Sequence, residues 1–212
     1  MPGSSSLRPT ILYQAISWIL FPAALAYTLV VAIKNRNCQY LAQRLGIYNF
    51  PAQNNNPIWC HCASVGEINT ALPLLNRLLE EGEQLVVSTN TTTGHEILIQ
   101  SNLKHTNAVL APLDYAYFSH NFTKKFSPKL LLLVETELWP NLCLTSISQK
   151  IPVIIVNGRI TEKTLNAPAI LKQNYSRILN NVEHIYASNQ SNAERFISLG
   201  ANNKRLSTLD NL

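Results

Sequence analysis

The sequence predicts an α/β protein with a doubly wound parallel sheet, preceded by an apolar N-terminal membrane helix. From Pro57 onward, short apolar runs alternate with amphipathic stretches of helical spacing, the pattern of a parallel sheet with crossover helices. The apolar runs are almost continuously hydrophobic, as strands covered on both faces are. Before them, no charged residue occurs between Arg8 and Lys34. A segment of that length and composition matches the apolar core of a bilayer.

The apolar runs predict strands at 58–63, 84–89, 108–112, 130–135, 153–157 and 184–188. The stretches between them predict helices at 67–81, 94–101, 115–126, 138–149 and 194–199. Gly82 ends the first helix, and Pro140 lies in the first turn of the fourth. Asp114 is expected to cap the helix that follows it. Right-handed crossovers are expected between the strands.

The composition limits the classes of partner. Charged residues are 14% of the chain and apolar residues 46%, so a large core is expected without disulfides. The net charge of +5 suits phosphates, an acidic sugar or a membrane surface. Nucleic acid is not an expected partner, because no basic cluster is interleaved with aromatics. The cysteines are expected to be buried thiols, and no metal site or cofactor is predicted.

Three parts of the chain are predicted. Residues 1–45 form a membrane anchor or interfacial helix with a basic flank, which carries Lys34, Arg36 and Arg44. The basic flank places the following residues on the cytoplasmic side. A spanning helix and a helix lying in the membrane plane both fit the pattern. Residues 46–57, rich in asparagine and proline, are expected as a linker, and 58–212 as the folded domain.

The first strand ends in a turn that holds a candidate catalytic residue. Ser64 and Gly66 precede Glu67, which opens a helix at the carboxyl end of the strand. Parallel sheets bind ligands at this edge, and a fixed carboxylate there is a candidate general base. The alternative is an ordinary acid that stabilises the positive end of a helix. The catalytic hypothesis requires the carboxylate to face an open groove.

Other polar residues follow neighbouring strands. Glu135 and Glu137 flank the end of the fourth strand, where an acid needs a hydrogen bond or a functional role. Alternatively, Glu137 caps its helix and Glu135 accepts backbone N–H groups. Arg159 follows the fifth strand, and it either clamps a phosphate or forms an ion pair with one of these glutamates.

A cluster of hydroxyls follows the second strand. Thr91, Thr92, Thr93 and Gly94 lie at the start of a helix and form a candidate anion-binding turn. Threonines are also ordinary helix caps, so the cluster alone does not establish an anion site.

Several peptides together resemble the Kdo (3-deoxy-D-manno-octulosonic acid) transferases of Gram-negative bacteria. They are HCASVGE at 61–67, TNTTTG at 89–94, ETELWPN at 135–141, IPVIIVNGR at 151–159 and SNAERF at 191–196. The apolar N-terminus with its basic flank matches as well. The likeness runs through nearly the whole chain in the right order.

The resemblance implies the N-terminal, Rossmann-like half of a GT-B glycosyltransferase. That half binds the lipid A precursor, and a C-terminal half binds the donor CMP-Kdo. The reaction is inverting, needs no metal and belongs to lipopolysaccharide biosynthesis at the cytoplasmic face of the inner membrane. The resemblance makes Glu67 the general base and Glu135 an active-site residue. A role for Arg159 with an anionic substrate is our inference.

The sequence ends near the family's interdomain junction, so we expect a fragment that lacks the donor-binding half. Such a chain is expected to bind the lipid acceptor without transferring sugar. Two other functions remain open. One is a non-catalytic, membrane-tethered module that binds an anionic lipid, and the other is a GT-B transferase with a different acceptor.

Overall fold

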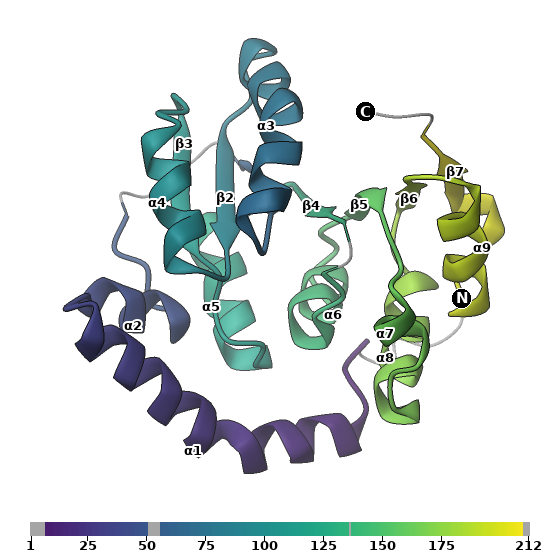
Figure 1. The fold of residues 1–212 in the computed structure, drawn as a ribbon, viewed down its shortest axis with the longest axis horizontal. Helices are drawn as coiled ribbons and strands as arrows, with labels where there is room; N and C mark the ends of the chain where they lie inside the picture. The colour runs from purple at the N-terminus through teal and green to yellow at the C-terminus, as the bar shows by residue number, and fades with distance from the viewer. Residues whose placement is uncertain (1–6, 51–55, 136, 210–212) are drawn as a thin grey trace.

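The computed structural model describes residues 7–50, 56–135 and 137–209. A seven-stranded sheet in the order β3-β2-β1-β4-β5-β6-β7 forms its centre, and all neighbouring strands are parallel. The strands are β1 Ile58–His61, β2 Leu85–Thr89, β3 Thr106–Leu110, β4 Leu130–Val134, β5 Val153–Gly158, β6 His184–Ala187 and β7 Leu206–Thr208. Figure 1 shows the helices arranged around this sheet. The predicted parallel α/β fold is therefore confirmed.

Successive residues of the central strands bury their side chains in two different clusters. On β4, Leu131 and Leu133 join one cluster, whereas Leu132 and Val134 join the other. Since side chains alternate along a strand, the two clusters lie on opposite faces of the sheet. Both faces are covered, which explains why the strands are continuously apolar.

The helices of the sheet domain cover these two clusters. Ile68 and Leu75 of α3 and Leu98 of α4 belong to one of them, and α5, α6, α8 and α9 contribute to the other. The bounds are α3 Val65–Glu80, α4 Thr92–Gln100, α5 Ala116–Phe126, α6 Pro140–Ser148, α7 Glu162–Leu165, α8 Ala169–Leu179 and α9 Gln190–Ser198, with a short 3₁₀ helix at Asn203–Arg205. Of the elements in the described residues, α2 (Cys38–Arg44), α7, α8, the 3₁₀ helix and β7 were not predicted.

The expectation for Asp114 was wrong. Tyr115 is the N-cap of α5 and makes no side-chain capping bond. The Asp114 carboxylate instead accepts from the backbone N–H groups of Asn141 (3.1 Å) and Leu142 (2.8 Å) in the first turn of α6. It also accepts from the Tyr13 hydroxyl at 2.8 Å. Asp114 thus joins three segments that are distant in sequence.

The N-terminal helix α1 (Ile11–Lys34) packs along the sheet domain. In Figure 1 it is the bent purple helix along the lower edge, running from the region of α8 to α2. Its N-cap Thr10 donates its N–H to Asn174 Oδ1 of α8 at 2.9 Å, and Asn174 Nδ2 donates to Thr10 Oγ1 at 3.1 Å. Farther along, the Tyr115 hydroxyl donates to the Ser17 carbonyl at 2.8 Å. By length and composition α1 is able to cross a membrane.

Part of the expected linker is packed against the domain. Tyr48 is buried, and its hydroxyl donates to the Leu110 carbonyl at 2.8 Å. Its ring lies edge-on to Phe122 and Phe126. Tyr48 therefore belongs to the core and Phe50 packs against it, whereas Ile47 and Asn49 are exposed and 51–55 lie outside the described residues.

We predict that Asn174→Ala destabilises the protein by about 1–3 kcal/mol, because it removes the two hydrogen bonds that join Thr10, the N-cap of α1, to α8. Asn174 is fully buried and also donates to the Ile170 carbonyl. Urea unfolding measures the change. Asn180→Ala, on the exposed end of α8, is the matched control and is expected to stay within about 0.5 kcal/mol of wild type. Equal effects of the two substitutions would contradict the docking role of Asn174.

Candidate functional site

The candidate site lies where the order of the strands reverses. From β1 the chain adds β2 and β3 on one side, then crosses to β4 on the other side of β1. Ligands of open α/β sheets bind in the crevice beyond such a switch point. Glu67 follows β1, and Glu135 and Glu137 follow its neighbour β4. The fold therefore brings the three predicted acids to the same sheet edge.

Glu67 is held in a helix cap. Ser64, the N-cap of α3, accepts from the Glu67 N–H at 3.3 Å, and its hydroxyl donates to Glu67 Oε1 at 2.8 Å. Ala63 N–H donates to Oε2 at 2.7 Å. This is a variant of the capping box in which the acid accepts from the N–H of Ala63, the residue before the N-cap, instead of from the N-cap itself. Glu67 is only 8% exposed and is absent from the residues lining the adjacent cavities, so its carboxylate is less open than the catalytic hypothesis required.

The capping bonds leave the Glu67 carboxylate able to accept further hydrogen bonds, including one from a substrate hydroxyl. Each carboxylate oxygen can accept two hydrogen bonds, and each uses one here. Burial raises the pKa of Glu67 above its ordinary value, and the charge of Glu135 raises it further. The bonds from Ser64 and Ala63 oppose this shift. A raised pKa brings a carboxylate closer to the range of an effective general base.

Glu135 has an unusual backbone conformation. Its φ is +61°, in the left-handed region that residues with side chains seldom adopt. Asn157, near the end of the neighbouring β5, has a φ of +52°. Such conformations often mark functional sites. Glu135 Oε1 lies 4.0 Å from Arg159 Nε, so the predicted ion pair is present.

Glu137 does not cap α6, contrary to the alternative expectation. The N-cap of that helix is Trp139, and its indole N–H donates to Glu137 Oε2. Burial raises the pKa of Glu137 to about 7, and the charges of Glu67 and Glu135 add to this increase, while the bond from Trp139 opposes it.

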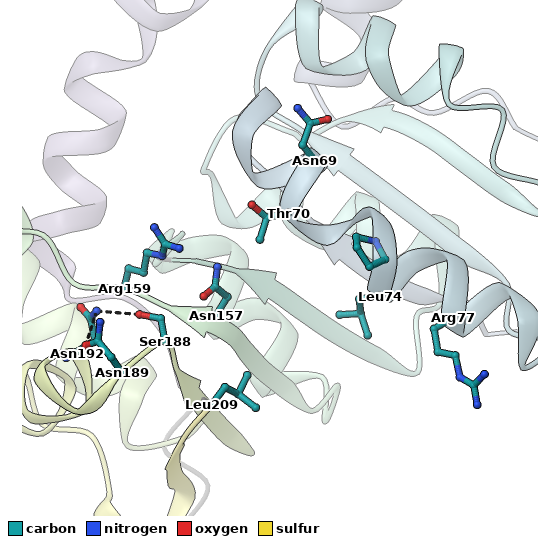
Figure 2. Close-up of a pocket in the computed structure, with 11 residues that line it drawn as sticks. Asn69, Thr70, Leu74, Arg77, Asn157, Arg159, Ser188, Asn189, Asn192 and Leu209 are labelled. Carbon is teal, nitrogen blue, oxygen red and sulfur yellow. Dashed lines mark hydrogen bonds between the residues drawn. The ribbon is translucent and has the colours of Figure 1, made fainter. Parts of the chain in front are cut away.

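Two cavities lie near the acids, and Glu137 lines the second of them. One, of 770 Å³, is lined by residues from α3 and from the ends of β5 and β6, among them Asn69, Thr70, Asn157, Arg159 and Ser188. Figure 2 shows Asn69 and Thr70 on α3, across from Arg159 and Asn157. Polar and cationic groups at a strand edge suit a phosphorylated or acidic ligand.

The second cavity, of 530 Å³, lies next to the N-terminal helix. Tyr13 of α1 lines it together with Glu137, Trp139, Lys163 and Tyr175. Leu138, Pro140, Ala167, Pro168 and Leu171 add apolar walls. Aromatic rings, one cation and one acid make this cavity suitable for a sugar attached to an apolar group.

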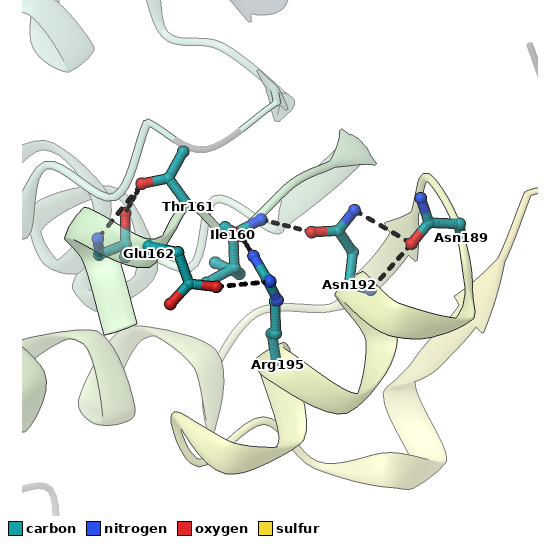
Figure 3. Close-up of polar contacts among 7 residues, drawn as sticks. Ile160, Thr161, Glu162, Asn189, Asn192 and Arg195 are labelled. Atoms are coloured by element: carbon teal, nitrogen blue, oxygen red, sulfur yellow. Dashed lines mark hydrogen bonds and ion pairs between the residues drawn. The ribbon is translucent and has the colours of Figure 1, made fainter. Parts of the chain in front are cut away.

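The segment after Arg159 is fixed by side chains of α9. The Ile160 N–H donates to Asn192 Oδ1 at 2.8 Å, and Arg195 Nη1 donates to the Ile160 carbonyl at 2.6 Å. Arg195 also forms an ion pair with Glu162 at 2.6 Å, as Figure 3 shows. These contacts restrain the backbone that carries Arg159 at the cavity.

The threonine turn has structural roles. Thr91 Oγ1 accepts from the Gly94 N–H at 3.0 Å and so caps α4. A Cβ on Gly94 would lie 2.6 Å from Thr89 Oγ1, so packing requires glycine there. Thr92 is half-buried and Thr93 exposed. Anion binding by this turn stays a prediction.

Gly66 has no comparable packing constraint. A Cβ there would meet only Ser64 Oγ, at 3.9 Å. The absence of a side chain leaves the start of α3, beside Glu67, open to a ligand.

In the described residues, no group of three His, Cys, Asp or Glu side chains is placed to hold a metal ion.

Sequence reasoning missed several residues that line the two cavities. Tyr13 belongs to the apolar N-terminal segment, and nothing in the local sequence shows that this segment packs against the sheet domain. Asn69 and Thr70 lie two and three residues after Glu67 on an exposed side of α3, and this polar spacing was the available signal.

Comparison with known proteins identifies the family. The model of the 3-deoxy-D-manno-octulosonic-acid transferase (Kdo transferase) family matches residues 39–212. The chain belongs to this family. It is 29% identical over 204 residues to the 3-deoxy-D-manno-octulosonic acid transferase of Haemophilus influenzae, covering 94% of this chain and 48% of that protein. It is 30% identical over 183 residues to a bifunctional glycosyltransferase/methyltransferase of Fusobacterium nucleatum, covering 85% of this chain and 29% of that protein.

This Kdo transferase-family chain spans about half the length, or less, of the curated relatives it matches. Among solved structures, it is similar to the UDP-GlcNAc 2-epimerase of Neisseria meningitidis, with a TM-score of 0.52 and 13% identity, over 73% of this chain and 46% of that chain. A second UDP-N-acetylglucosamine 2-epimerase gives 0.53 and 12%, over 74% of this chain and 49% of that chain. These likenesses show the fold alone, a Rossmann-like half of the GT-B kind.

The raised pKa of Glu137 predicts a pH-dependent stability. Its pKa of about 7 exceeds the ordinary value of 4.5, so between these values the native protein binds more protons than the unfolded chain. The free energy of unfolding therefore falls as pH rises through this window. We predict that Glu137→Gln has little effect at pH 4 but stabilises the protein at pH 8 by about 1–2 kcal/mol, discounted for partial solvation.

Urea unfolding at both pH values measures this difference. Glu194→Gln, at an exposed position on α9, is the control and is expected to change stability by less than about 0.5 kcal/mol at either pH. An equal effect of Glu137→Gln at pH 4 and pH 8 would show that the acid is not retained in its neutral form.

Proposed function

We propose that this chain is the acceptor-binding half of an inverting Kdo transferase that transfers Kdo from CMP-Kdo to lipid A precursor in lipopolysaccharide biosynthesis. The observation that carries the proposal is the meeting of Glu67, Glu135 and Glu137 at the switch point of a Kdo transferase-family domain. The edge also provides Arg159, which pairs with Glu135 and lines the larger cavity.

Glu67 is the proposed general base. A sugar hydroxyl is a poor nucleophile until its proton is removed. Glu67 takes that proton, the acceptor oxygen bonds to the anomeric carbon of Kdo, and the bond from that carbon to the CMP phosphate oxygen breaks. CMP leaves with the electron pair. The capping bonds hold the carboxylate in one orientation, and Gly66 leaves space for the acceptor beside it.

The other acids and the arginine have supporting roles in this proposal. Glu135 keeps Arg159 at the edge, and Arg159 stabilises negative charge on a substrate or on the departing CMP. Glu137 binds acceptor hydroxyls in the smaller cavity. Ser64 orients Glu67, and the turn of Thr91, Thr92, Thr93 and Gly94 lies on the neighbouring strand end as a further anion contact.

The two cavities bind the two substrates in this proposal. The smaller cavity is walled by Tyr13 of the apolar helix α1, which supports approach of a lipid-borne acceptor from the inner membrane at its cytoplasmic face. The larger cavity supports contact with CMP-Kdo, held by a second domain of the kind that the greater length of the relatives suggests. The proposal involves no metal, cofactor or nucleic acid.

One observation favours a second candidate function. Both oxygens of Glu67 are engaged in the helix cap and the residue is nearly buried. If the cap is its whole role, the chain is a membrane-tethered module that holds an anionic glycolipid without catalysis. A GT-B transferase with another acceptor would keep the base but change the residues of the smaller cavity.

We predict that Glu67→Gln, in the complete enzyme, lowers turnover by about 10²-fold or more, the contribution typical of a general base. Glutamine also serves in a capping box, so the fold and acceptor binding are expected to be retained. Steady-state kinetics and a glycolipid-binding assay measure the two effects. Glu67→Ala is the matched variant that loses the cap as well. Near-normal turnover with Glu67→Gln would assign Glu67 to the cap alone.

A further inference from the structure

Helix α1 is apolar on all sides, but only one side contacts the protein. Thr28 and Ala32 are buried against the domain, and the Phe21 ring packs against Tyr115 and Phe118 of the sheet domain. Away from this contact, α1 exposes large apolar side chains along its whole length: Ile11, Leu12, Ile16, Ile19, Leu20, Tyr27, Leu29, Val30 and Ile33. The 24 residues make a stripe about 36 Å long at 1.5 Å per residue. A continuous apolar stripe of this length marks an interaction surface.

Helix α1 contacts the domain near both of its ends. Near the start, Thr10 exchanges two hydrogen bonds with the fully buried Asn174, and the Tyr13 hydroxyl donates to Asp114. Near the end, α1 packs against α2, where Ala32 and Tyr40 belong to one buried cluster. If α1 left the domain, these contacts would be lost and buried polar groups would have no hydrogen-bond partners.

A docked α1 is incompatible with spanning. If it crossed the bilayer in this conformation, α8 would enter the hydrocarbon beside it. That helix carries Lys172 and Arg177, both exposed. Charged side chains at that depth are strongly disfavoured. The packing therefore favours an orientation in which only the outer side of α1 meets lipid.

The positions of the charged residues around α1 indicate what covers its exposed apolar side. Exposed cations lie at both ends of α1, with Arg8 before it and Lys34 and Arg36 at its end. The first turn of α1 contains no acid. The one charged residue of the whole helix is Lys34, in its last turn. Both ends can therefore reach the headgroups of a single leaflet. Pro22 lies inside the helix, and Figure 1 shows α1 bent around the lower edge of the domain.

We propose that α1 is an interfacial helix that stays docked on the domain and lies in the plane of one anionic leaflet. Its outer side inserts at the boundary between headgroups and acyl chains, while the sheet domain covers its other side. The proposal rests on the packing of α1 and does not depend on the transferase chemistry. It also brings the cavity lined by Tyr13 and Glu137 to the membrane surface.

Depth measurements distinguish this arrangement from a spanning helix. Leu12, Ile19, Ala23 and Val30 are all exposed on the outer side of α1. Single cysteines at these positions, in a Cys38→Ser background, carry a nitroxide label, and the full chain is bound to vesicles with anionic lipid. The other native cysteines are buried. Accessibility to oxygen and to a water-soluble relaxant gives the depth of each label.

We expect one shallow depth at all four positions. A spanning helix would instead place residues 12 and 23 about 16 Å apart in depth, at 1.5 Å per residue. That pattern, or four labels that remain in water on bound vesicles, would overturn the proposal. A label on Ile99, an exposed residue of α4, is the control and is expected to stay in water.

A binding experiment tests the surface independently. Ile19→Glu is expected to weaken vesicle binding about tenfold or more, the loss of burying one isoleucine. Ile99→Glu, at a similarly exposed isoleucine, is expected to have no effect. Removing one cation with Arg36→Gln is expected to weaken binding to anionic vesicles about fivefold. Circular dichroism confirms that each variant is folded. Equal binding to neutral and anionic vesicles, or equal effects of the two glutamate variants, would contradict the proposal.

Discussion

The carboxylate of the half-buried Asp114 connects the N-terminal helix to the candidate site. It accepts from the Tyr13 hydroxyl of α1 and from the N–H groups of Asn141 and Leu142 that open α6. Burial raises the pKa of Asp114, and these hydrogen bonds oppose that shift. Since α6 begins directly after Glu137 and Trp139, the same carboxylate that holds α1 also fixes the end of the acidic loop. The N-terminal helix and the candidate site are thus positioned together.

The fold was predictable where the sequence is locally consistent. The central strands are apolar on both faces, so composition alone revealed them, and the helix expected from Glu67 onward begins two residues earlier, at Val65. The role of Asp114 was not predictable, because its partners lie 27 and 28 residues away along the chain. The missed β7 has three residues, and the missed α8 mixes polar and apolar positions.

The sequence predicted which strand ends carry the candidate residues, but not how those residues are arranged in space. Position after β1 and β4 identified Glu67 and Glu135, yet the adjacency of those two strands depends on strand order. The left-handed backbone of Glu135 and the ion pair with Arg159 arise from tertiary packing. The cap that engages both oxygens of Glu67 was compatible with the sequence, but the extent of its burial was not visible there.

The central claim is that the edge formed by the ends of β1 and β4 binds a lipid-borne acceptor. Hydrogen–deuterium exchange of the chain in anionic bicelles, with and without lipid A precursor, tests it most directly. The account predicts that the glycolipid slows exchange of the amides at 63–67 and 137–139, while those of α4 and β3 are unchanged. Slower exchange confined to other segments, with none at these strand ends, would contradict it.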